Sequence, residues 1–151
     1  MATTQYLFAG FGGQGILFSG KFLAYKGLTE DKQVSWLPSY GPEMRGGTAS
    51  CSVIISDTPV GSPIVSKPDV LVAMNPASIK ANMRWLKPGT TIIFDVDSLT
   101  DKSLEKAGYA ADPTTDDTLS QYKVIKAPIS SLTLEALKDF GMDRKSMLKS
   151  K

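Results

Sequence analysis

The chain has 151 residues, of which 42% are hydrophobic and 21% are charged, and its 17 Lys and Arg residues nearly balance 15 Asp and Glu residues. This length suits one hydrophobic core, so we expect a single folded domain over residues 1–151. The near balance of charge, without a run of Lys or Arg, argues against a nucleic-acid partner. No apolar stretch approaches the roughly 18 residues of a membrane-spanning helix, so we expect no membrane association.

The chain has no histidine and a single cysteine, Cys51. Such a sequence cannot supply a histidine-based catalytic triad, a histidine general base, or an ordinary zinc or iron–sulfur ligand set. One cysteine forms no internal disulfide, and the N-terminus lacks the basic stretch and apolar run of a signal peptide. We therefore expect a cytoplasmic protein whose demanding chemistry comes from a cofactor or from another subunit.

The first half of the chain alternates strand and helix patterns. A short apolar run at residues 6–9 predicts a strand, and the helical spacing of apolar residues from Ile16 onward predicts a helix. Residues 34–37 form a second predicted strand, and residues 38–47 form a polar loop rich in glycine. Residues 48–55 alternate in polarity, as a half-buried strand requires.

The second half continues the alternation. Residues 70–74 are a continuous apolar run, which is typical of a parallel strand covered on both faces, and Asn75 and Pro76 follow as N-cap and first residue of a helix. The remaining predicted segments are strands at 91–94 and 122–125, a polar, turn-rich surface stretch at 101–119, and helices at 131–140 and from 143 onward. Together the pattern predicts an α/β fold, with a mostly parallel sheet, helices on both faces and a Rossmann-like glycine-rich first turn.

The turn between the first strand and the first helix reads GFGGQG and matches the G-x-G-x-x-G pattern. Gly10 permits a tight turn, while Gly12 and Gly13 let a ligand approach the backbone. Gly15 lets helix and strand pack closely. Free amides and the helix dipole at this point favour a bound anion, so we predict a phosphate-bearing ligand. The alternative is that the glycines only satisfy the backbone geometry.

A nicotinamide dinucleotide requires more than the glycine pattern. Its ribose needs an acidic residue roughly 20 residues after the motif, at the end of the second strand. Here Pro38 follows that strand directly. The acidic residues nearby are Glu30 and Asp31, which precede the strand, and Glu43, which lies beyond the proline. A different phosphate carrier is therefore favoured, and a free-standing NAD(P)-binding oxidoreductase remains the alternative.

Residues 39–47, with the sequence SYGPEMRGG, form the other unusual segment. A loop this rich in glycine can place Tyr40, Glu43 and Arg45 against a ligand or a partner protein. The alternative is an ordinary surface loop with a local ion pair between Glu43 and Arg45.

Several further residues allow two interpretations. Cys51 lies on the apolar face of an alternating strand, which favours a core position over a catalytic one. Asp95 and Asp97 follow a strand and are either a ligand-binding pair at the sheet edge or helix-capping groups. An aromatic stripe on the first helix is either packed in the core or a docking face for a partner. This stripe consists of Phe18, Phe22 and Tyr25.

The sequence resembles the γ subunit of 2-oxoacid:ferredoxin oxidoreductases. Three segments carry the resemblance: GFGGQG at residues 10–15, SYGPEMRGGTASCSVI at residues 39–54 and VLVAMNPAS at residues 70–78. The second segment is most similar to the 2-oxoglutarate and branched-chain 2-ketoacid members. The resemblance covers nearly the whole chain, although γ subunits commonly continue with a further apolar helix whereas this sequence ends at Lys151. Whether the chain is truncated at its C-terminus therefore stays open.

The resemblance implies a subunit of an oxidoreductase rather than an enzyme by itself. The parent complexes oxidatively decarboxylate a 2-oxoacid, transfer the acyl group to coenzyme A and pass electrons through iron–sulfur clusters to ferredoxin. Thiamine diphosphate, magnesium and the iron–sulfur clusters belong to the partner α and β subunits, with a ferredoxin-like δ subunit in some complexes. The isolated chain is expected to be inactive. A third hypothesis is a purely structural subunit that uses its aromatic stripe and leaves the glycine turn empty.

The resemblance also assigns residues, none of them catalytic or metal-binding. The coenzyme A phosphates are assigned to Gly10, Gly12, Gly13, Gln14 and Gly15, together with Asn75 and Pro76 at the neighbouring helix start. The side of the chain that faces the thiamine site at the subunit junction is assigned to Tyr40, Gly41, Glu43 and Arg45.

Overall fold

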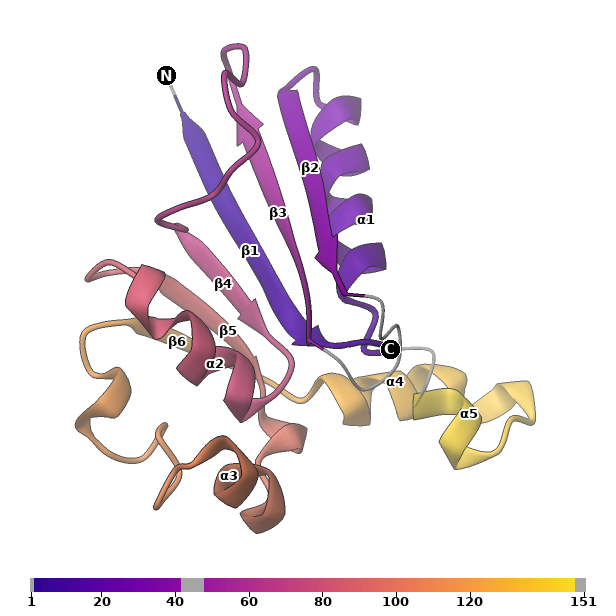
Figure 1. Cartoon of the computed structure of the whole chain (residues 1–151). Helices are drawn as coiled ribbons and strands as arrows, with labels where there is room; N and C mark the ends of the chain where they lie inside the picture. Colours follow the sequence, from indigo (N-terminus) through magenta and orange to yellow (C-terminus); the bar gives the residue numbers. More distant parts are fainter. Residues whose placement is uncertain (1, 42–47, 149–151) are drawn as a thin grey trace.

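The computed structural model describes residues 2–41 and 48–148 of the chain (Figure 1). Six strands form one sheet in the order β2-β3-β1-β4-β5-β6. The strands are β1 (Thr3–Phe11), β2 (Gln33–Tyr40), β3 (Thr48–Ser56), β4 (Val70–Ala73), β5 (Thr91–Asp95) and β6 (Lys123–Ala127). β3 is antiparallel to both of its neighbours, whereas the pairs β1–β4, β4–β5 and β5–β6 are parallel. Of the strands described, β3 alone runs against the others, which confirms the mostly parallel α/β sheet.

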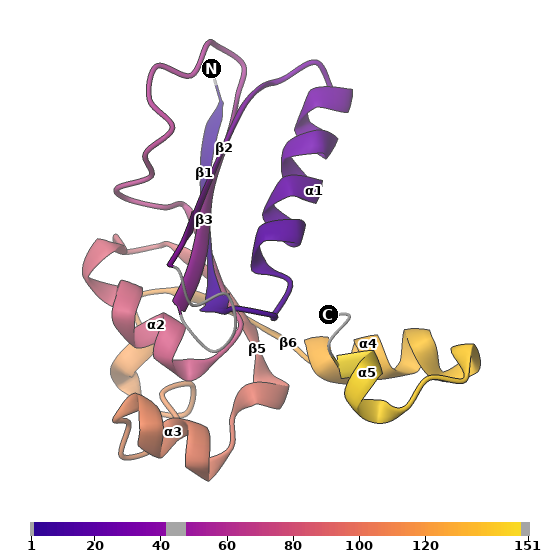
Figure 2. The same cartoon turned by 45° about the vertical axis from the view of Figure 1, so that its right-hand side comes forward.

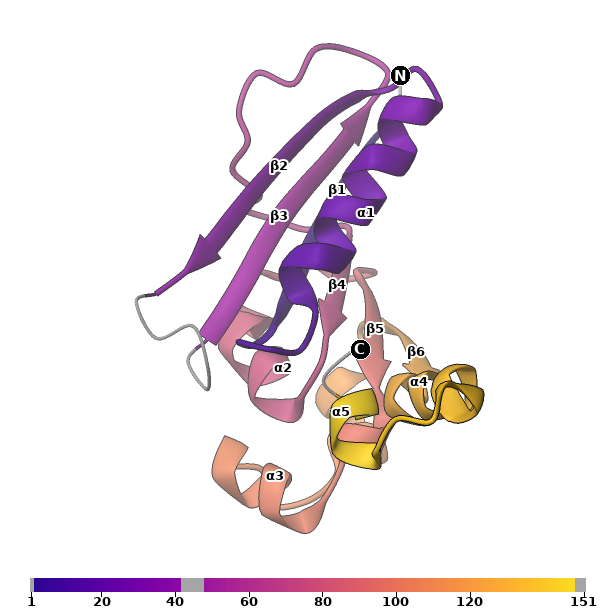
Figure 3. The same cartoon turned by 90° about the vertical axis from the view of Figure 1, so that its right-hand side faces the viewer.

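Helices lie on both faces of this sheet (Figures 1 and 2). They are α1 (Ile16–Thr29), α2 (Pro76–Asn82), α3 (Asp101–Ala107), α4 (Ile129–Leu137) and α5 (Arg144–Leu148). Short 3-10 helices complete the chain, namely η1 (Met83–Trp85), η2 (Val96–Ser98), η3 (Asp117–Leu119) and η4 (Lys138–Phe140). α1 covers β1, β2 and β3 on one face, while α2 and α3 lie on the opposite side, as Figures 2 and 3 show. α4 and α5 extend beyond the carboxyl end of the sheet.

The core has two halves because successive side chains of a strand point to opposite faces. Leu7 belongs to the half beneath α2, and its neighbour Phe8 belongs to the half beneath α1. The α2 half contains Leu7, Ala9, Leu71, Ala73, Ile79, Ile92, Phe94 and Leu119. The α1 half contains Phe8, Ile16, Ala24, Cys51, Val53 and Met74. Burial on both faces explains why residues 70–74 carry no polar alternation.

α1 packs closely on the sheet because small residues line its buried stripe. Ile16, Gly20, Ala24 and Gly27 are its buried positions. The opposite stripe of Phe18, Phe22 and Tyr25 is 74%, 68% and 58% exposed in this chain. Core packing of these aromatic residues, one of the two sequence interpretations, is therefore wrong for the isolated chain.

Two helices differ from the sequence expectation. α3 lies inside the stretch expected to be turn-rich surface, and it is stabilised by a capping box in which Thr100 and Ser103 exchange side-chain to backbone hydrogen bonds. α4 begins at Ile129, before the expected start at Ser131, because carboxylates from the sheet edge accept hydrogen bonds from its first amides. Within the described residues, no helix has both the length and the hydrophobicity needed to span a bilayer.

The contact between α1 and β3 gives the first prediction. A Cβ atom at Gly20 would lie 2.2 Å from the Sγ atom of Cys51. Gly20→Ala therefore forces the helix away from the strand, and we expect the free energy of unfolding to fall by about 1–3 kcal/mol, although alanine is the better helix former. Urea unfolding measures this change.

Two matched variants test the cause. Gly61→Ala adds the same methyl group where nothing lies within 4 Å, and it should leave the stability within about 0.5 kcal/mol of wild type. In a Cys51→Ala background, where the clashing sulfur is gone, the cost of Gly20→Ala should largely disappear. An equal cost in both backgrounds would contradict the proposed clash.

Candidate functional site

The candidate site lies where the chain leaves the sheet in two directions. β1 and β4 are parallel neighbours, and β1 leads into α1 on one face whereas β4 leads into α2 on the other. Such a switch point opens a crevice at the carboxyl ends of the two strands, and ligands of open α/β sheets bind there. Both predicted ligand-binding segments, residues 10–15 and residues 75–76, meet at this crevice.

The glycine turn leaves the start of α1 open. Gly15 is the N-cap residue with a φ of 70°, and Gly13 has a φ of 90°, a left-handed conformation that strongly favours glycine. No side chain of the described residues caps α1. The amides of its first turn therefore keep their hydrogen-bonding capacity, and the helix dipole adds partial positive charge at the same point. This arrangement suits an anionic group.

The Gln14 side chain stabilises the glycine turn by hydrogen bonds. Its Oε1 atom accepts hydrogen bonds from the backbone N–H of Phe11, at 2.7 Å, and from Nδ2 of Asn75, at 3.0 Å. The Oδ1 atom of Asn75 in turn accepts from the backbone N–H of Ser78, at 2.9 Å, which confirms the predicted N-cap of α2. The Gln14 side chain thus ties the β1–α1 turn to the β4–α2 turn.

Gly10 is required by close packing at the same point. A Cβ atom there would lie 2.7 Å from Cδ1 of Ile16 and 2.8 Å from Oε1 of Gln14. Any larger residue would displace either the first helical residue or the Gln14 side chain. Gly10 therefore fixes the path of the turn, whereas a Cβ atom at Gly13 would have nothing within 4 Å.

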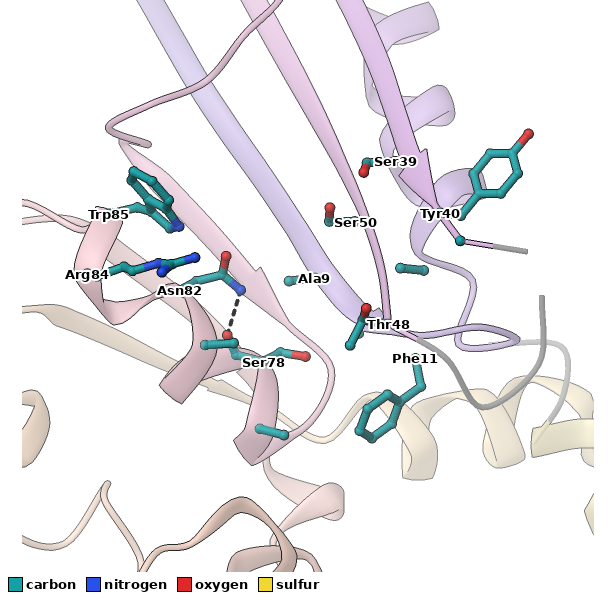
Figure 4. A pocket seen from close by; sticks show the side chains of 15 residues that line it. Ala9, Phe11, Ser39, Tyr40, Thr48, Ser50, Ser78, Asn82, Arg84 and Trp85 are labelled. Carbon is teal, nitrogen blue, oxygen red and sulfur yellow. Dashed lines mark hydrogen bonds between the residues drawn. The ribbon is translucent and has the colours of Figure 1, made fainter. Parts of the chain in front are cut away.

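Two cavities open beside the turn. The first, which we call the glycine cavity, has a volume of about 250 Å³ and lies against Gly12, Gly13, Gly15 and the first turn of α1. The second, which we call the α2 cavity, has a volume of about 380 Å³ and lies on the other face of the sheet (Figure 4). Its polar lining includes Ser39, Ser50, Ser78, Asn82 and Arg84. Both cavities border Phe11, Tyr40, Thr48 and Ala49, so they adjoin at the end of β1.

The structure describes two of the four residues assigned to the subunit junction. Tyr40 is 57% exposed and borders both cavities, and Gly41 borders the α2 cavity. Glu43 and Arg45 lie outside the described residues. The junction assignment of all four positions stays a prediction.

The strand order weighs against a nicotinamide dinucleotide. In that class the acidic residue for the ribose ends the strand next to β1. Here β3 pairs with β1 and separates it from β2. The end of β2 is therefore two strands away from the glycine turn.

Asp95 and Asp97 bind backbone N–H groups at the start of α4. Asp95 is fully buried, and its Oδ1 atom accepts a hydrogen bond from the N–H of Ile129 at 3.1 Å. Oδ2 of Asp97 accepts from the N–H of Ser131 at 2.6 Å. The two carboxylates thus hold the start of α4 against the sheet edge, as the helix-capping interpretation predicts.

Sequence reasoning missed the α2 cavity, including Asn82, Arg84 and Trp85. A signal was available, because Ser78, Asn82 and Trp85 follow the spacing i, i+4, i+7 of a helical face in the sequence, although the structure places Trp85 in η1, just after the end of α2. The residues opposite them come from β1, β2 and β3. No local pattern could show that these strands lie across from α2.

Three comparisons place the chain among known proteins. The model of a family described as pyruvate ferredoxin/flavodoxin oxidoreductase matches residues 5–148. The ketoisovalerate oxidoreductase subunit VorA of Methanothermobacter thermautotrophicus is 51% identical over 87 residues, which is 58% of this chain and 18% of VorA. The chain spans between about a fifth and about half of the length of the curated relatives it matches.

Solved structures share the fold. The γ subunit of a keto/oxoacid ferredoxin oxidoreductase from Geobacter sulfurreducens matches with a TM-score of 0.66 and 26% identity, over 97% of this chain and 71% of that one. The 2-oxoglutarate:ferredoxin oxidoreductase of Magnetococcus marinus, solved with 2-oxoglutarate, coenzyme A and succinyl-CoA bound, matches with a TM-score of 0.72 and 24% identity. That match covers 98% of this chain and 23% of the other.

The environment of Cys51 yields the second prediction. Its side chain is 1% exposed, its S–H group donates to the carbonyl oxygen of Ile16, and burial raises the pKa of the thiol to about 11. At pH 8 we expect the native thiol to react with iodoacetamide on the order of 100-fold more slowly than an exposed cysteine, because the thiolate is the reactive form. Mass spectrometry of native and urea-unfolded protein measures the modification. Rapid labelling of the native chain would show an accessible nucleophile instead of a core residue.

Proposed function

Because this chain belongs to the pyruvate ferredoxin/flavodoxin oxidoreductase family, we propose that it is the γ-type part of a 2-oxoacid:ferredoxin oxidoreductase and that it binds coenzyme A. The observation that carries this proposal is the uncapped start of α1, which faces a cavity of about 250 Å³ and follows a glycine turn. Free amides at a helix start bind phosphate groups. Coenzyme A offers such groups in its pyrophosphate.

The names of the relatives support this ligand and this class of reaction. VorA is a ketoisovalerate oxidoreductase subunit, and the structure from Magnetococcus marinus holds 2-oxoglutarate, coenzyme A and succinyl-CoA. We infer that this chain acts in oxidative decarboxylation of 2-oxoglutarate or a related 2-oxoacid to the acyl-CoA. Electrons then pass to ferredoxin.

The contribution of this chain is to hold coenzyme A in position. Gly12 and Gly13 let the pyrophosphate approach the backbone, and the first-turn amides of α1 donate hydrogen bonds to its oxygen atoms. The link from Gln14 to Asn75 holds the turn in place before the ligand arrives. A ligand anchored this way keeps its thiol at a high effective concentration near the acyl group that it receives.

The reacting groups belong to partners in this proposal. As the resemblance to γ subunits implies, we place thiamine diphosphate, magnesium and the iron–sulfur clusters on α and β subunits, with or without a ferredoxin-like δ subunit. The absence of histidine and the single buried cysteine of this sequence agree with that placement. We place four residues at the junction with those subunits, namely Tyr40, Gly41, Glu43 and Arg45. Of these, Tyr40 and Gly41 line the α2 cavity. The isolated chain then binds coenzyme A without catalysing the reaction.

Gly13→Val tests the proposal. Valine is strained at the φ of 90° that Gly13 adopts, and its branched side chain would occupy the space that the phosphates need. We expect the affinity of the purified chain for coenzyme A to fall at least about tenfold, which corresponds to about 1.4 kcal/mol. Isothermal titration calorimetry measures this affinity.

Gly89→Val is a matched control. Gly89 has a φ of 85° and, like Gly13, has no atom within 4 Å of a Cβ position. It lies in a turn that borders neither cavity. This variant carries a similar backbone strain and should bind coenzyme A as tightly as wild type. Equal affinity of the wild type and Gly13→Val would remove the glycine turn from coenzyme A binding.

A further inference from the structure

Arg84 gives the α2 cavity a distinct chemistry. It is the only charged side chain among the described residues that line either cavity. Its guanidinium carbon lies 4.7 Å from the centre of the Trp85 ring, and it forms no ion pair with a carboxylate in the described parts of the chain. Trp85 therefore supports Arg84 through a cation–π contact, which leaves the N–H groups at the guanidinium edge available for a ligand.

The surroundings of Arg84 suit an oxyanion. Figure 4 shows the Arg84 side chain extending from η1 toward Asn82. Across the cavity, Ser39 and Ser50 are partners in the register of β2 and β3, so their hydroxyl groups lie on one face of the sheet. The guanidinium fork and the hydroxyl groups that line this cavity are both hydrogen-bond donors to phosphate oxygen atoms.

The two cavities can serve one ligand. They adjoin along Phe11, Tyr40, Thr48 and Ala49, and the α2 cavity alone, at about 380 Å³, is within the size range of ligand pockets. A ligand that binds both at the start of α1 and at Arg84 carries two separate anionic groups. Coenzyme A has this chemistry, because its ribose carries a 3′-phosphate monoester apart from the pyrophosphate.

We propose that Arg84 binds the 3′-phosphate of coenzyme A in the α2 cavity and thereby selects coenzyme A over ligands that lack this phosphate. The inference rests on the proposed function and adds a specificity-determining residue to it. The pyrophosphate binds at the glycine turn, and the nucleotide end crosses the carboxyl end of β1 to the opposite face of the sheet. Trp85 is a positioning residue that holds the guanidinium group.

The experiment compares coenzyme A with 3′-dephospho-coenzyme A. Each is titrated into the full chain by calorimetry, for the wild type and for Arg84→Gln. We expect the wild type to prefer coenzyme A on the order of tenfold to a hundredfold, as hydrogen bonds to a charged group provide. Arg84→Gln should lose this preference while its affinity for 3′-dephospho-coenzyme A stays within about twofold of wild type. Arg144→Gln, which removes the same charge from α5 outside both cavities, should keep the full preference.

Each outcome decides between the two claims. Equal affinity of the wild type for both ligands, or an unchanged preference in Arg84→Gln, overturns the role of Arg84 and leaves coenzyme A binding intact. A wild-type chain that binds neither ligand contradicts the proposed function itself. If Arg84→Gln does not fold, Arg84→Lys is titrated in its place, because lysine keeps the charge but not the fork. A reduced preference then supports the assignment, and a full preference overturns it.

Discussion

The proposed ligand site depends on one constraint, which is that the backbone amides at the start of α1 stay free of the side chains of the described residues. A helix start normally satisfies some of its orphan N–H groups with a Ser, Thr, Asp or Asn cap. Here the N-cap position is Gly15, and the described residues supply no side-chain cap. The helix therefore keeps hydrogen-bonding capacity and partial positive charge at the switch point of the sheet. Both the free N–H groups and the partial positive charge favour a ligand with negatively charged oxygen atoms.

A free helix start is useful only when its position is fixed. Close packing at Gly10 sets the path of the turn, and the Gln14 side chain connects it to Asn75 at the start of α2. Asn75 caps α2 through its other amide atom, so one side-chain link orders both turns that border the crevice. The glycine cavity and the α2 cavity border the two turns that this link connects, and the proposal of one extended ligand for both cavities builds on that arrangement.

The sequence predicted what depends on local patterns. The polar alternation at residues 48–55 and the cap at Asn75 both follow from neighbouring residues, and both are confirmed. The insertion of β3 between β1 and β2 depends on pairing between distant segments and could not be read locally. α3 escaped prediction because its capping box uses Ser103 where Glu or Gln is the usual signal. The α2 cavity could not be predicted for the same reason, because the residues on its two sides come from α2 and from the sheet, which are distant in the sequence.

Amide chemical shifts of the isotopically labelled chain, titrated with coenzyme A, test the central claim most directly. The account predicts that the largest and saturable shifts occur at the amides of Gly12, Gly13, Ile16 and Leu17. A titration in which these signals stay fixed, while the shifts gather on the exposed aromatic stripe of α1 or do not occur, would contradict it.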